Sequence, residues 1–354
     1  MKHYTIPFFI PHKGCPFQCV FCDQNNITGQ KSIKPDEVSG KIDLYLSTID
    51  PRNADIEVGF FGGTFTGIDQ KDQLAFLGPV QKYVKKGIIK GIRLSTRPDF
   101  IDKRKLSFLK DQSVKCIELG VQSISDRVLQ ASKRGYTSKD VKRASSMIKD
   151  LGFVLGHQMM LGLPLSDWAD EYLTAKTAKD LGVQEVRIYP TLVIKNTELA
   201  DRWVNKQYVP LSEAEAVERS AKLILYFGSN GIKVIKCGLH PSEGLLSGED
   251  MLDGPFHTAF GFKVESRVFS FMLKYIQNNI VAGNRENSFL LYNPKDEAAL
   301  LGFEKENVPL ISDICRKENL KKNDDAIRGQ IELNYSGKSV TVDRNIVAGT
   351  IFDP

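Results

Sequence analysis

The sequence predicts an α/β protein built on a parallel barrel or part-barrel, followed by a small C-terminal α+β extension. Short β-forming runs alternate with longer helical patterns up to about residue 240, as in a parallel sheet with crossover helices. Several runs are apolar on both faces, such as Val58-Gly59-Phe60-Phe61, which is typical of strands covered on both sides. After residue 240, Gly, Pro and His interrupt this pattern. We therefore assign the barrel to residues 1–240 and the extension to residues 241–354.

The predicted strands of the barrel are short and spaced along the chain with helical patterns between them. They cover residues 4–10, 56–61, 91–95, 114–120, 153–161, 185–189 and 232–237. Two helices between them have recognisable starts, because Thr137 with Asp140 and Ser212 with Glu215 have the spacing of a capping box. In a parallel barrel of this kind, chemistry gathers at the C-terminal ends of the strands.

The extension shows two further elements. A helical pattern covers residues 263–279, and residues 330–344 alternate around Ser336-Gly337. Alternation on both sides of a short turn signal is typical of a β-hairpin. The extension is thus expected to contain a helix and a hairpin.

Composition narrows the class of protein only mildly. Of the 354 residues, 42% are hydrophobic and 26% charged, as in ordinary globular proteins. The net charge of +5 permits a polyanionic partner but does not require one. The first apolar run is short and bracketed by Pro7 and Pro11, unlike a secretory signal, and no apolar stretch is long enough to span a bilayer. We expect a cytoplasmic protein with no membrane partner.

The first strand is followed by a cluster of cysteines. Three of the six cysteines, Cys15, Cys19 and Cys22, fall within eight residues. In a reducing compartment, clustered cysteines are more often metal ligands than disulfide partners. Three thiolates can each hold one iron of a cubane cluster, whereas a structural zinc needs a fourth ligand, for which His12 is the nearest candidate. An iron–sulfur cluster, a zinc site and structural cysteines are the open interpretations.

Polar and glycine-rich motifs follow the next strands. Gly62-Gly63-Thr64-Phe65 follows the second strand, and two glycines let a backbone approach a ligand closely, although a tight turn has the same pattern. Ser95-Thr96-Arg97-Pro98-Asp99 follows the third. Glu118 and Gln122 end the fourth, where unpaired polar side chains would be costly in a core. We expect Glu118 and Gln122 to meet a polar ligand or each other.

The cysteine spacing, C-x₃-C-x₂-C, resembles the signature of the radical S-adenosylmethionine (SAM) superfamily. The resemblance implies a partial (β/α)6-type parallel barrel of the radical SAM kind. It also implies that Cys15, Cys19 and Cys22 hold a [4Fe–4S] cluster whose fourth iron is chelated by the amino and carboxylate groups of SAM. An electron from this cluster would cleave SAM to methionine and a 5′-deoxyadenosyl radical. The protein's part is to position the cofactors and exclude water.

Roles for individual residues follow from the same resemblance. Phe21 would lie against adenine, Gly62 and Gly63 would contact the SAM amino group, and Arg134 would reach the SAM carboxylate. The alternatives are a core Phe21 and a surface Arg134. His157, in the Gly156–Pro164 segment that would lie along the adenine, also fits a hydrogen-bonded structural histidine. The full set of expected SAM-binding residues is Phe21, Gly62, Gly63, Thr64, Ser95, Arg97, Glu118, Gln122, Arg134 and Met160.

The series of motifs resembles one branch, the radical SAM domain of Elongator's catalytic subunit and its short bacterial relatives. Gly-Gly-Thr-Phe, Arg-Pro-Asp, Leu-Gly-Val-Gln-Ser, Arg-Gly-x-Thr and the segment Ile188–Thr197 occur in that order, and the match covers about residues 5–230. The cysteine spacing is shorter than in that family. No acetyl-CoA pattern is recognisable after residue 240. The resemblance therefore implies shared chemistry more firmly than a shared substrate.

The expected function is a radical SAM enzyme that modifies RNA, supplied with electrons by a donor such as flavodoxin or ferredoxin. An electropositive rim with Lys195, Lys236 and Arg187 would fit an RNA. The alternatives are a radical SAM enzyme acting on a small molecule, as in the related coproporphyrinogen oxidases, and a non-catalytic iron–sulfur or zinc module. Cys237 and His240 are the candidate catalytic residues, as hydrogen-atom donor or proton-transfer group; a buried cysteine and a turn histidine are the alternative.

Overall fold

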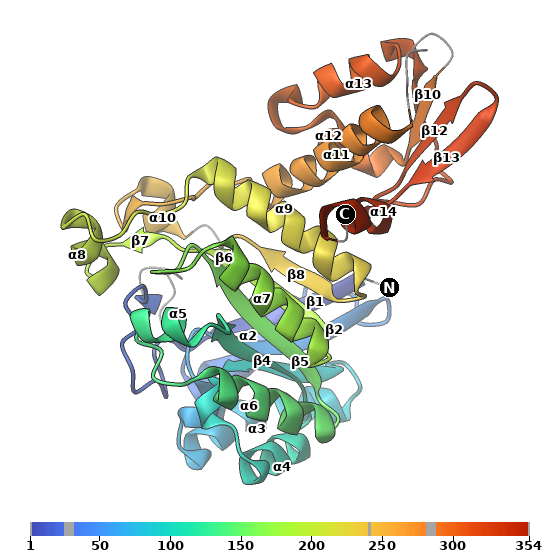
Figure 1. Cartoon of the computed structure of the whole chain (residues 1–354). Coiled ribbons are helices and arrows are strands. Elements are labelled where there is room, and N and C mark those ends of the chain that lie inside the picture. The colour runs from blue at the N-terminus through green and yellow to red at the C-terminus, as the bar shows by residue number, and fades with distance from the viewer. Residues whose placement is uncertain (1, 25–31, 240–241, 281–287, 353–354) are drawn as a thin grey trace. The chain divides into compact units, whose positions relative to one another are not determined.

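The computed structural model describes residues 2–24, 32–239, 242–280 and 288–352 (Figure 1). The chain forms two compact units. The first contains Met1–Leu211 and Leu239–Pro255, and the second contains Ser212–Gly238 and Phe256–Pro354. The candidate cofactor residues all lie in the first unit, which is therefore described in more detail.

A parallel sheet forms the centre of the first unit. Its strands follow one another in chain order: β1 (Lys2–Phe9), β2 (Ala54–Phe61), β3 (Gly91–Thr96), β4 (Val114–Gln122), β5 (Val154–Leu161) and β6 (Glu185–Pro190). All five neighbouring pairs among them are parallel. The predicted partial parallel barrel is confirmed, and the observed strand ends lie within two residues of the predicted ones.

Helices connect these strands, as parallel pairing requires. They are α2 (Val38–Leu46), α3 (Gln70–Lys85), α4 (Lys103–Asp111), α5 (Asp126–Ala131), α6 (Ser138–Asp150) and α7 (Trp168–Asp180). The capping box of Thr137 and Asp140 opens α6 as predicted, and Asp167 with Asp170 opens α7 in the same way. After β6 come β7 (Val193–Ile194), α8 (Glu198–Val204), α10 (Glu243–Ser247) and β9 (Met251–Asp253), where β7 pairs antiparallel with β9.

The two faces of the sheet differ in character. On β2, Ile56, Val58 and Phe60 are fully buried, and the rings of Phe60 and Phe8 stack with centroids 5.4 Å apart. Successive side chains of a strand point to opposite faces, so the residues between them, such as Glu57, face the other way. Apolar contacts thus hold the helix-covered face, while the inner face carries polar side chains.

The second unit contains a small mixed sheet and a group of helices. Its strands are β8 (Lys233–Cys237), β10 (Phe289–Tyr292), β11 (Leu320–Lys322), β12 (Ile331–Tyr335) and β13 (Lys338–Val342), of which the last four pair in the order β11-β10-β12-β13. Its helices are α9 (Glu213–Ser229), α11 (Phe260–Asn279), α12 (Glu297–Leu301), α13 (Val308–Ile314) and α14 (Arg344–Phe352). The antiparallel pair of β12 and β13 confirms the predicted hairpin, and α11 confirms the predicted helix. In the part of the chain that the structure describes, no helix is long and apolar enough to cross a membrane.

Candidate functional site

The loop that carries the three cysteines leaves β1 and packs directly against the Gly-Gly turn after β2. The His12 N–H donates to Gly62 O (3.0 Å), and the Thr64 N–H donates to Lys13 O (2.9 Å). A Cβ atom at Gly63 would lie 2.6 Å from Lys13 O and 2.7 Å from Ile10 O. Gly63 is therefore needed for the close approach of the cysteine loop, a protein contact that the sequence did not reveal.

The three cysteines lie on one loop and differ in exposure. Cys19 is 3% exposed, Cys15 and Cys22 are half-buried, and the Cys22 N–H donates to Cys19 O (3.0 Å). Burial, together with the neighbouring Cys19 and Cys15, raises the pKa of the Cys22 thiol to about 12. Among the described residues, no three His, Cys, Asp or Glu side chains are already grouped as metal ligands. The loop supplies three thiols of the right chemistry within eight residues of the chain.

His12 has a role that differs from zinc binding. Its Nε2 accepts a hydrogen bond from the backbone N–H of Gln24 (2.9 Å) and lies 3.8 Å from Asp23 Oδ1. The Gln24 side-chain amide lies 3.7 Å from Cys22 Sγ. The imidazole thus ties the start of the cysteine loop to its end, which disfavours His12 as a fourth zinc ligand.

Arg134 is the residue that binds the cysteine loop most directly. It is buried, and its three guanidinium nitrogens donate to Cys19 Sγ (3.1 Å), to the Tyr136 hydroxyl (2.9 Å) and to Gly120 O (2.6 Å). Its guanidinium carbon lies 5.9 Å from the ring centroid of Phe21. The alternative of an exposed surface arginine is wrong, because Arg134 joins the cysteine loop to the end of β4.

Arg97, in the Arg-Pro-Asp motif after β3, anchors the same loop through an aromatic side chain. Asp99 accepts hydrogen bonds from Arg97 Nε (3.0 Å) and Nη2 (2.9 Å). The guanidinium carbon lies 4.3 Å from the ring centroid of Phe17 and 5.0 Å from that of Tyr136. The remaining nitrogen, Nη1, is buried and has no hydrogen-bond partner among the described residues.

An irregularity in the pairing of β4 with β5 changes the direction of the Gln122 side chain. The pairing of β4 with β5 shifts between Gly120 and Gln122, and Gln122 has φ of 64°. Such bulges re-aim side chains, often beside functional sites. The Gln122 amide nitrogen and an Arg134 nitrogen lie over Gly120, 3.3 and 3.4 Å from the position a Cβ would take there. Gln122 Oε1 is buried without a partner in the described part of the chain.

The other expected SAM-binding residues lie close to these. Ser95 is buried and its hydroxyl donates to Phe60 O (3.4 Å), and Thr64 is buried in the turn after β2. Phe21 belongs to an apolar cluster with Cys19, against which Cys22 and Met160 pack. The structure thus gathers the cysteine loop and the ends of β2 to β5 at one edge of the sheet.

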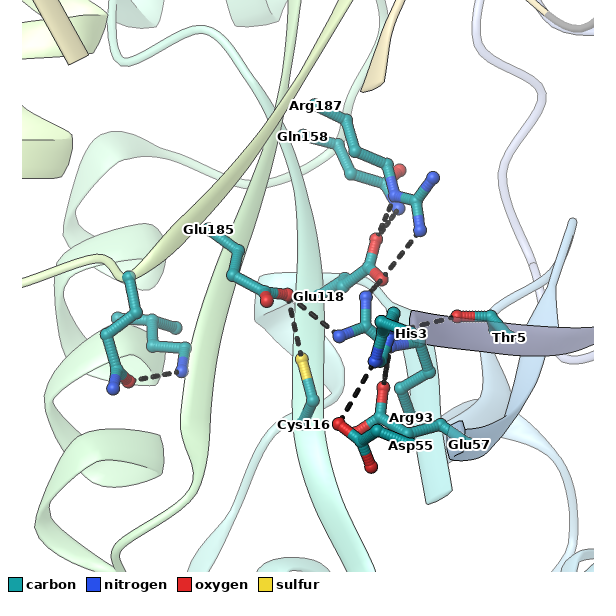
Figure 2. A network of polar contacts seen from close by, with 12 residues as sticks. His3, Thr5, Asp55, Glu57, Arg93, Cys116, Glu118, Gln158, Glu185 and Arg187 are labelled. Carbon is teal, nitrogen blue, oxygen red and sulfur yellow. Dashed lines mark hydrogen bonds and ion pairs between the residues drawn. The ribbon is translucent and has the colours of Figure 1, made fainter. Parts of the chain in front are cut away.

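Glu118 lies deeper, at the centre of a polar network on the inner face (Figure 2). It is 1% exposed and accepts from Arg93 Nη1 (3.0 Å), from Arg187 through Nε and Nη2, and from Gln158 Nε2 (3.2 Å). Gly156 makes room for it, since a Cβ there would lie 2.9 Å from Glu118 Cγ. Glu118 does not meet Gln122, because two arginines and an amide fill its acceptor sites.

Arg93 extends this network across the sheet. Besides Glu118, it donates to Glu57 (2.8 Å) and to Glu185 (2.9 Å). Burial alone would lower the pKa of the Arg93 guanidinium, but the carboxylates of Glu118, Glu57 and Glu185 outweigh it and raise the pKa above its ordinary value. Burial also raises the pKa of the Cys116 thiol, so that this thiol stays neutral beside Glu185. Arg93 therefore remains charged and joins β2, β4 and β6.

Three further residues that the sequence singled out are His157, Cys237 and His240. His157 is buried, its Nε2 is 2.9 Å from the Ser145 hydroxyl of α6, and burial lowers its pKa to about 3, so it is a neutral structural histidine. Cys237 ends β8 in the second unit, and burial raises its pKa to about 12. His240 lies outside the described residues. The catalytic roles of Cys237 and His240 stay predictions.

The sequence reasoning missed Phe17, Tyr136, Arg93 and Gln158. Phe17 and Tyr136 carry no local signal, because Arg97, which both contact, and Gly120, which accepts from Tyr136, are distant in the sequence. Charged residues at every second position did offer a signal, as in Glu185 and Arg187 on β6. Such alternation within an otherwise apolar strand marks a polar inner face.

The chain is similar to known proteins in sequence and in fold. Residues 9–174 match the family described as the radical SAM superfamily, and residues 183–269 match the radical SAM C-terminal domain. Among curated proteins, the chain is 34% identical over 128 residues to a tRNA uridine(34) acetyltransferase of Methanocaldococcus jannaschii, which is 35% of this chain and 24% of that protein. It is 32% identical over 148 residues to Elongator complex protein 3 of Homo sapiens, covering 40% of this chain and 27% of that protein. These matches span about a quarter of the relatives' lengths.

A solved structure supports the fold. The Elp3 of Methanocaldococcus infernus, with residues 1–46 deleted, superposes with a TM-score of 0.59 at 21% identity. The superposition covers 81% of this chain and 70% of that one. At this identity the similarity establishes the architecture and leaves the reaction to be argued from the residues.

Proposed function

The chain belongs to the radical SAM superfamily, whose enzymes use a [4Fe–4S] cluster and SAM, and we propose that Cys15, Cys19 and Cys22 are the ligands of that cluster. When bound, the cluster supplies the electron that cleaves SAM to methionine and a 5′-deoxyadenosyl radical. The observation that carries this assignment is the buried Arg134, whose Nη1 lies 3.1 Å from Cys19 Sγ. Hydrogen bonds to metal-ligating side chains orient them and adjust the properties of the metal.

The residues present fit the two cofactors in three respects. Three thiols in one loop leave one position of a four-iron cluster open, as a ligand such as SAM requires. The loop is held by protein contacts, through Gly63 and through Phe17 on Arg97. Two buried atoms without partners among the described residues, Arg97 Nη1 and Gln122 Oε1, offer a donor and an acceptor to a polar ligand.

The protein's own residues bind and shield the cofactors. Arg134 orients Cys19 and Phe21, and its guanidinium places a positive charge beside Cys19, where it could attract a carboxylate. Phe21 and Met160 pack with Cys19 in one apolar cluster and exclude water from that side. Ser95, Thr64 and Gln122 supply polar groups at the strand ends. Glu118 already accepts hydrogen bonds from Arg93, Arg187 and Gln158, so it holds these side chains in place and does not bind the cofactor itself.

We propose RNA as the substrate class, with a uridine of tRNA as the target. The support is the similarity to the tRNA uridine(34) acetyltransferase of M. jannaschii, together with the net charge of +5. A mildly basic surface favours a polyanion. An electron donor such as flavodoxin or ferredoxin would supply the reducing equivalent.

The cofactor assignment is tested by anaerobic reconstitution with iron and sulfide, followed by addition of dithionite and SAM. We expect 5′-deoxyadenosine in the wild type and loss of the cubane absorbance and product in Cys19→Ala. Cys315→Ala, a change at a buried cysteine of the second unit, is the matched control and should keep both. A full cubane in Cys19→Ala would refute the ligand assignment. A loaded wild type that forms no 5′-deoxyadenosine would refute the reaction.

The substrate is tested by comparing modified nucleosides in RNA from a deletion strain and its parent. We expect one modified uridine to be missing from the tRNA of the deletion strain. An unchanged nucleoside profile would refute the RNA substrate and favour a small molecule.

A further inference from the structure

Arg187 and Gln158 each keep one hydrogen-bonding atom that Glu118 does not use. Arg187 donates Nε and Nη2 to Glu118, which leaves Nη1. Gln158 donates Nε2 to Glu118 Oε2 (3.2 Å). Because an ionised carboxylate only accepts, the amide must face it with its nitrogen, which leaves Oε1 as a free acceptor. Within the described ranges, neither Arg187 Nη1 nor Gln158 Oε1 has a partner.

These two free atoms are neighbours and face the same way. Gln158 and Arg187 are paired residues of β5 and β6. In Figure 2 both side chains reach Glu118 from the same side, and their unused atoms point away from it. The Arg187 side chain is 17% exposed, and Gln158 is half-buried. A ligand can therefore reach a donor and an acceptor that lie side by side.

The charges around this pair select a neutral ligand. Arg93 and Arg187 are the two guanidinium groups of the network, and three carboxylates bind them, those of Glu57, Glu118 and Glu185 (Figure 2). Negative charge is thus in excess, and Glu118 already neutralises Arg187. A phosphate or carboxylate would add a fourth negative group in a partly desolvated place, which is unfavourable. A neutral group that both donates and accepts matches the free atoms.

An aromatic ring next to the pair favours a flat ligand. The Arg187 guanidinium carbon lies 5.0 Å from the ring centroid of Phe61, and Phe61 lies 6.3 Å from Phe9, centroid to centroid. Proteins hold unstacked RNA bases on aromatic side chains while reading their hydrogen-bonding edges. Phe61, at the end of β2 before the Gly-Gly turn, supplies such a ring.

We propose that Arg187 and Gln158 read the imide edge of a uracil base. Arg187 Nη1 donates to a ring carbonyl oxygen, and Gln158 Oε1 accepts the N3–H. Glu118 positions both side chains by accepting hydrogen bonds from Arg187 Nε and Nη2 and from Gln158 Nε2. This inference rests on the proposed RNA substrate and assigns the residues that specify the base.

The test uses the cluster-loaded enzyme with SAM and without reductant, so that binding is measured and no turnover occurs. The probes are an anticodon stem–loop RNA with uridine at the first anticodon position, and the same RNA with 3-methyluridine or cytidine there. Fluorescence anisotropy gives each Kd. Because 3-methyluridine lacks the N3–H, we expect the wild type to bind it about tenfold more weakly than uridine, which corresponds to one buried hydrogen bond.

Variants then assign this discrimination to the two side chains. Gln158→Met keeps the volume but not the acceptor, so it should bind the uridine and 3-methyluridine RNAs equally. Arg187→Lys keeps the positive charge opposite Glu118 but lacks the planar guanidinium, and with it the Nη1 donor to the base. It should weaken binding of the uridine RNA about tenfold. Gln81→Met is the matched control: Gln81 lies on α3 and donates to Gln112 O (2.9 Å), so its loss should leave the discrimination intact.

The outcomes separate this inference from the function on which it rests. Equal binding of uridine and 3-methyluridine RNAs by the wild type would overturn the inference alone, and so would an undiminished discrimination in Gln158→Met. A cytidine RNA that binds as tightly as the uridine RNA would overturn the assignment to an imide edge. If the folded, loaded wild type binds none of the RNAs, the proposed substrate falls with the inference. Thermal unfolding checks that each variant is folded, and the wild-type comparison needs no variant.

Discussion

Gly63→Ala is the most direct test of how the cysteine loop is held. A Cβ at Gly63 would lie 2.6 Å from Lys13 O and 2.7 Å from Ile10 O, and both neighbours are backbone atoms. They must retreat by about 0.4 and 0.3 Å merely to reach 3.0 Å, below which such contacts essentially do not occur. Overpacking of this kind costs about 1–3 kcal/mol. Because Lys13 lies two residues before Cys15, the strain falls on the candidate cluster ligands.

The effect is measured on two scales. Urea unfolding of the wild type and of Gly63→Ala should show a loss of about 1–3 kcal/mol in the free energy of unfolding. Iron and sulfide content after reconstitution should fall as well, since the loop that carries Cys15 is displaced. Gly78→Ala is the matched control: Gly78 lies inside α3 with no atom within 4 Å of its Cβ position, and Ala there should be neutral or stabilising by up to about 1 kcal/mol.

The reasoning fails if Gly63→Ala is as stable as the wild type and binds a full cluster. That result would mean that the cysteine loop tolerates displacement from the Gly-Gly turn, and that Gly63 has no packing role. A loss of stability with full cluster content would separate the two effects and refute only the link to the ligands.

Two further changes probe the inner face and a buried histidine. Glu118→Gln should lower the free energy of unfolding by about 3–5 kcal/mol, because Arg93 and Arg187 would lose their shared buried carboxylate. Asp55→Asn, the control, removes a half-exposed partner of His3 and should lower it by no more than about 1 kcal/mol. Urea unfolding measures both, and equal losses would contradict the stabilising role of Glu118. Burial lowers the pKa of His157 to about 3 from an ordinary 6.5, so the unfolded chain takes up a proton below pH 6.5 that the folded chain refuses down to about pH 3. Stability is therefore lost as pH falls through this window, by about 2 kcal/mol at about pH 5. His157→Gln has no imidazole to protonate and should not lose this stability. The difference in free energy of unfolding between the wild type and His157→Gln should therefore shrink between neutral pH and about pH 5. A difference that does not change with pH in urea unfolding would refute a neutral buried imidazole.

Local signals in the sequence were sufficient for the elements and the order of the motifs. Strand patterns, two capping boxes and the hairpin turn depend on residues within a few positions of one another, so each could be read from one segment. The cysteine spacing and the motifs at the ends of β2 to β4 predicted a cofactor site at one edge of the sheet, because parallel strands bring their C-terminal ends to one side.

Only the tertiary structure decided what the polar residues contact. The sequence placed Glu118 beside a ligand or Gln122, but Arg93, Arg187 and Gln158 reach it from three other strands. Arg134 meets Cys19 across 115 positions of the chain. Such partners depend on strand order, on register and on a bulge that turns Gln122, and none of these leaves a local pattern. The sequence by itself therefore determined the kind of chemistry, and long-range packing decided which side chains are left free for a ligand.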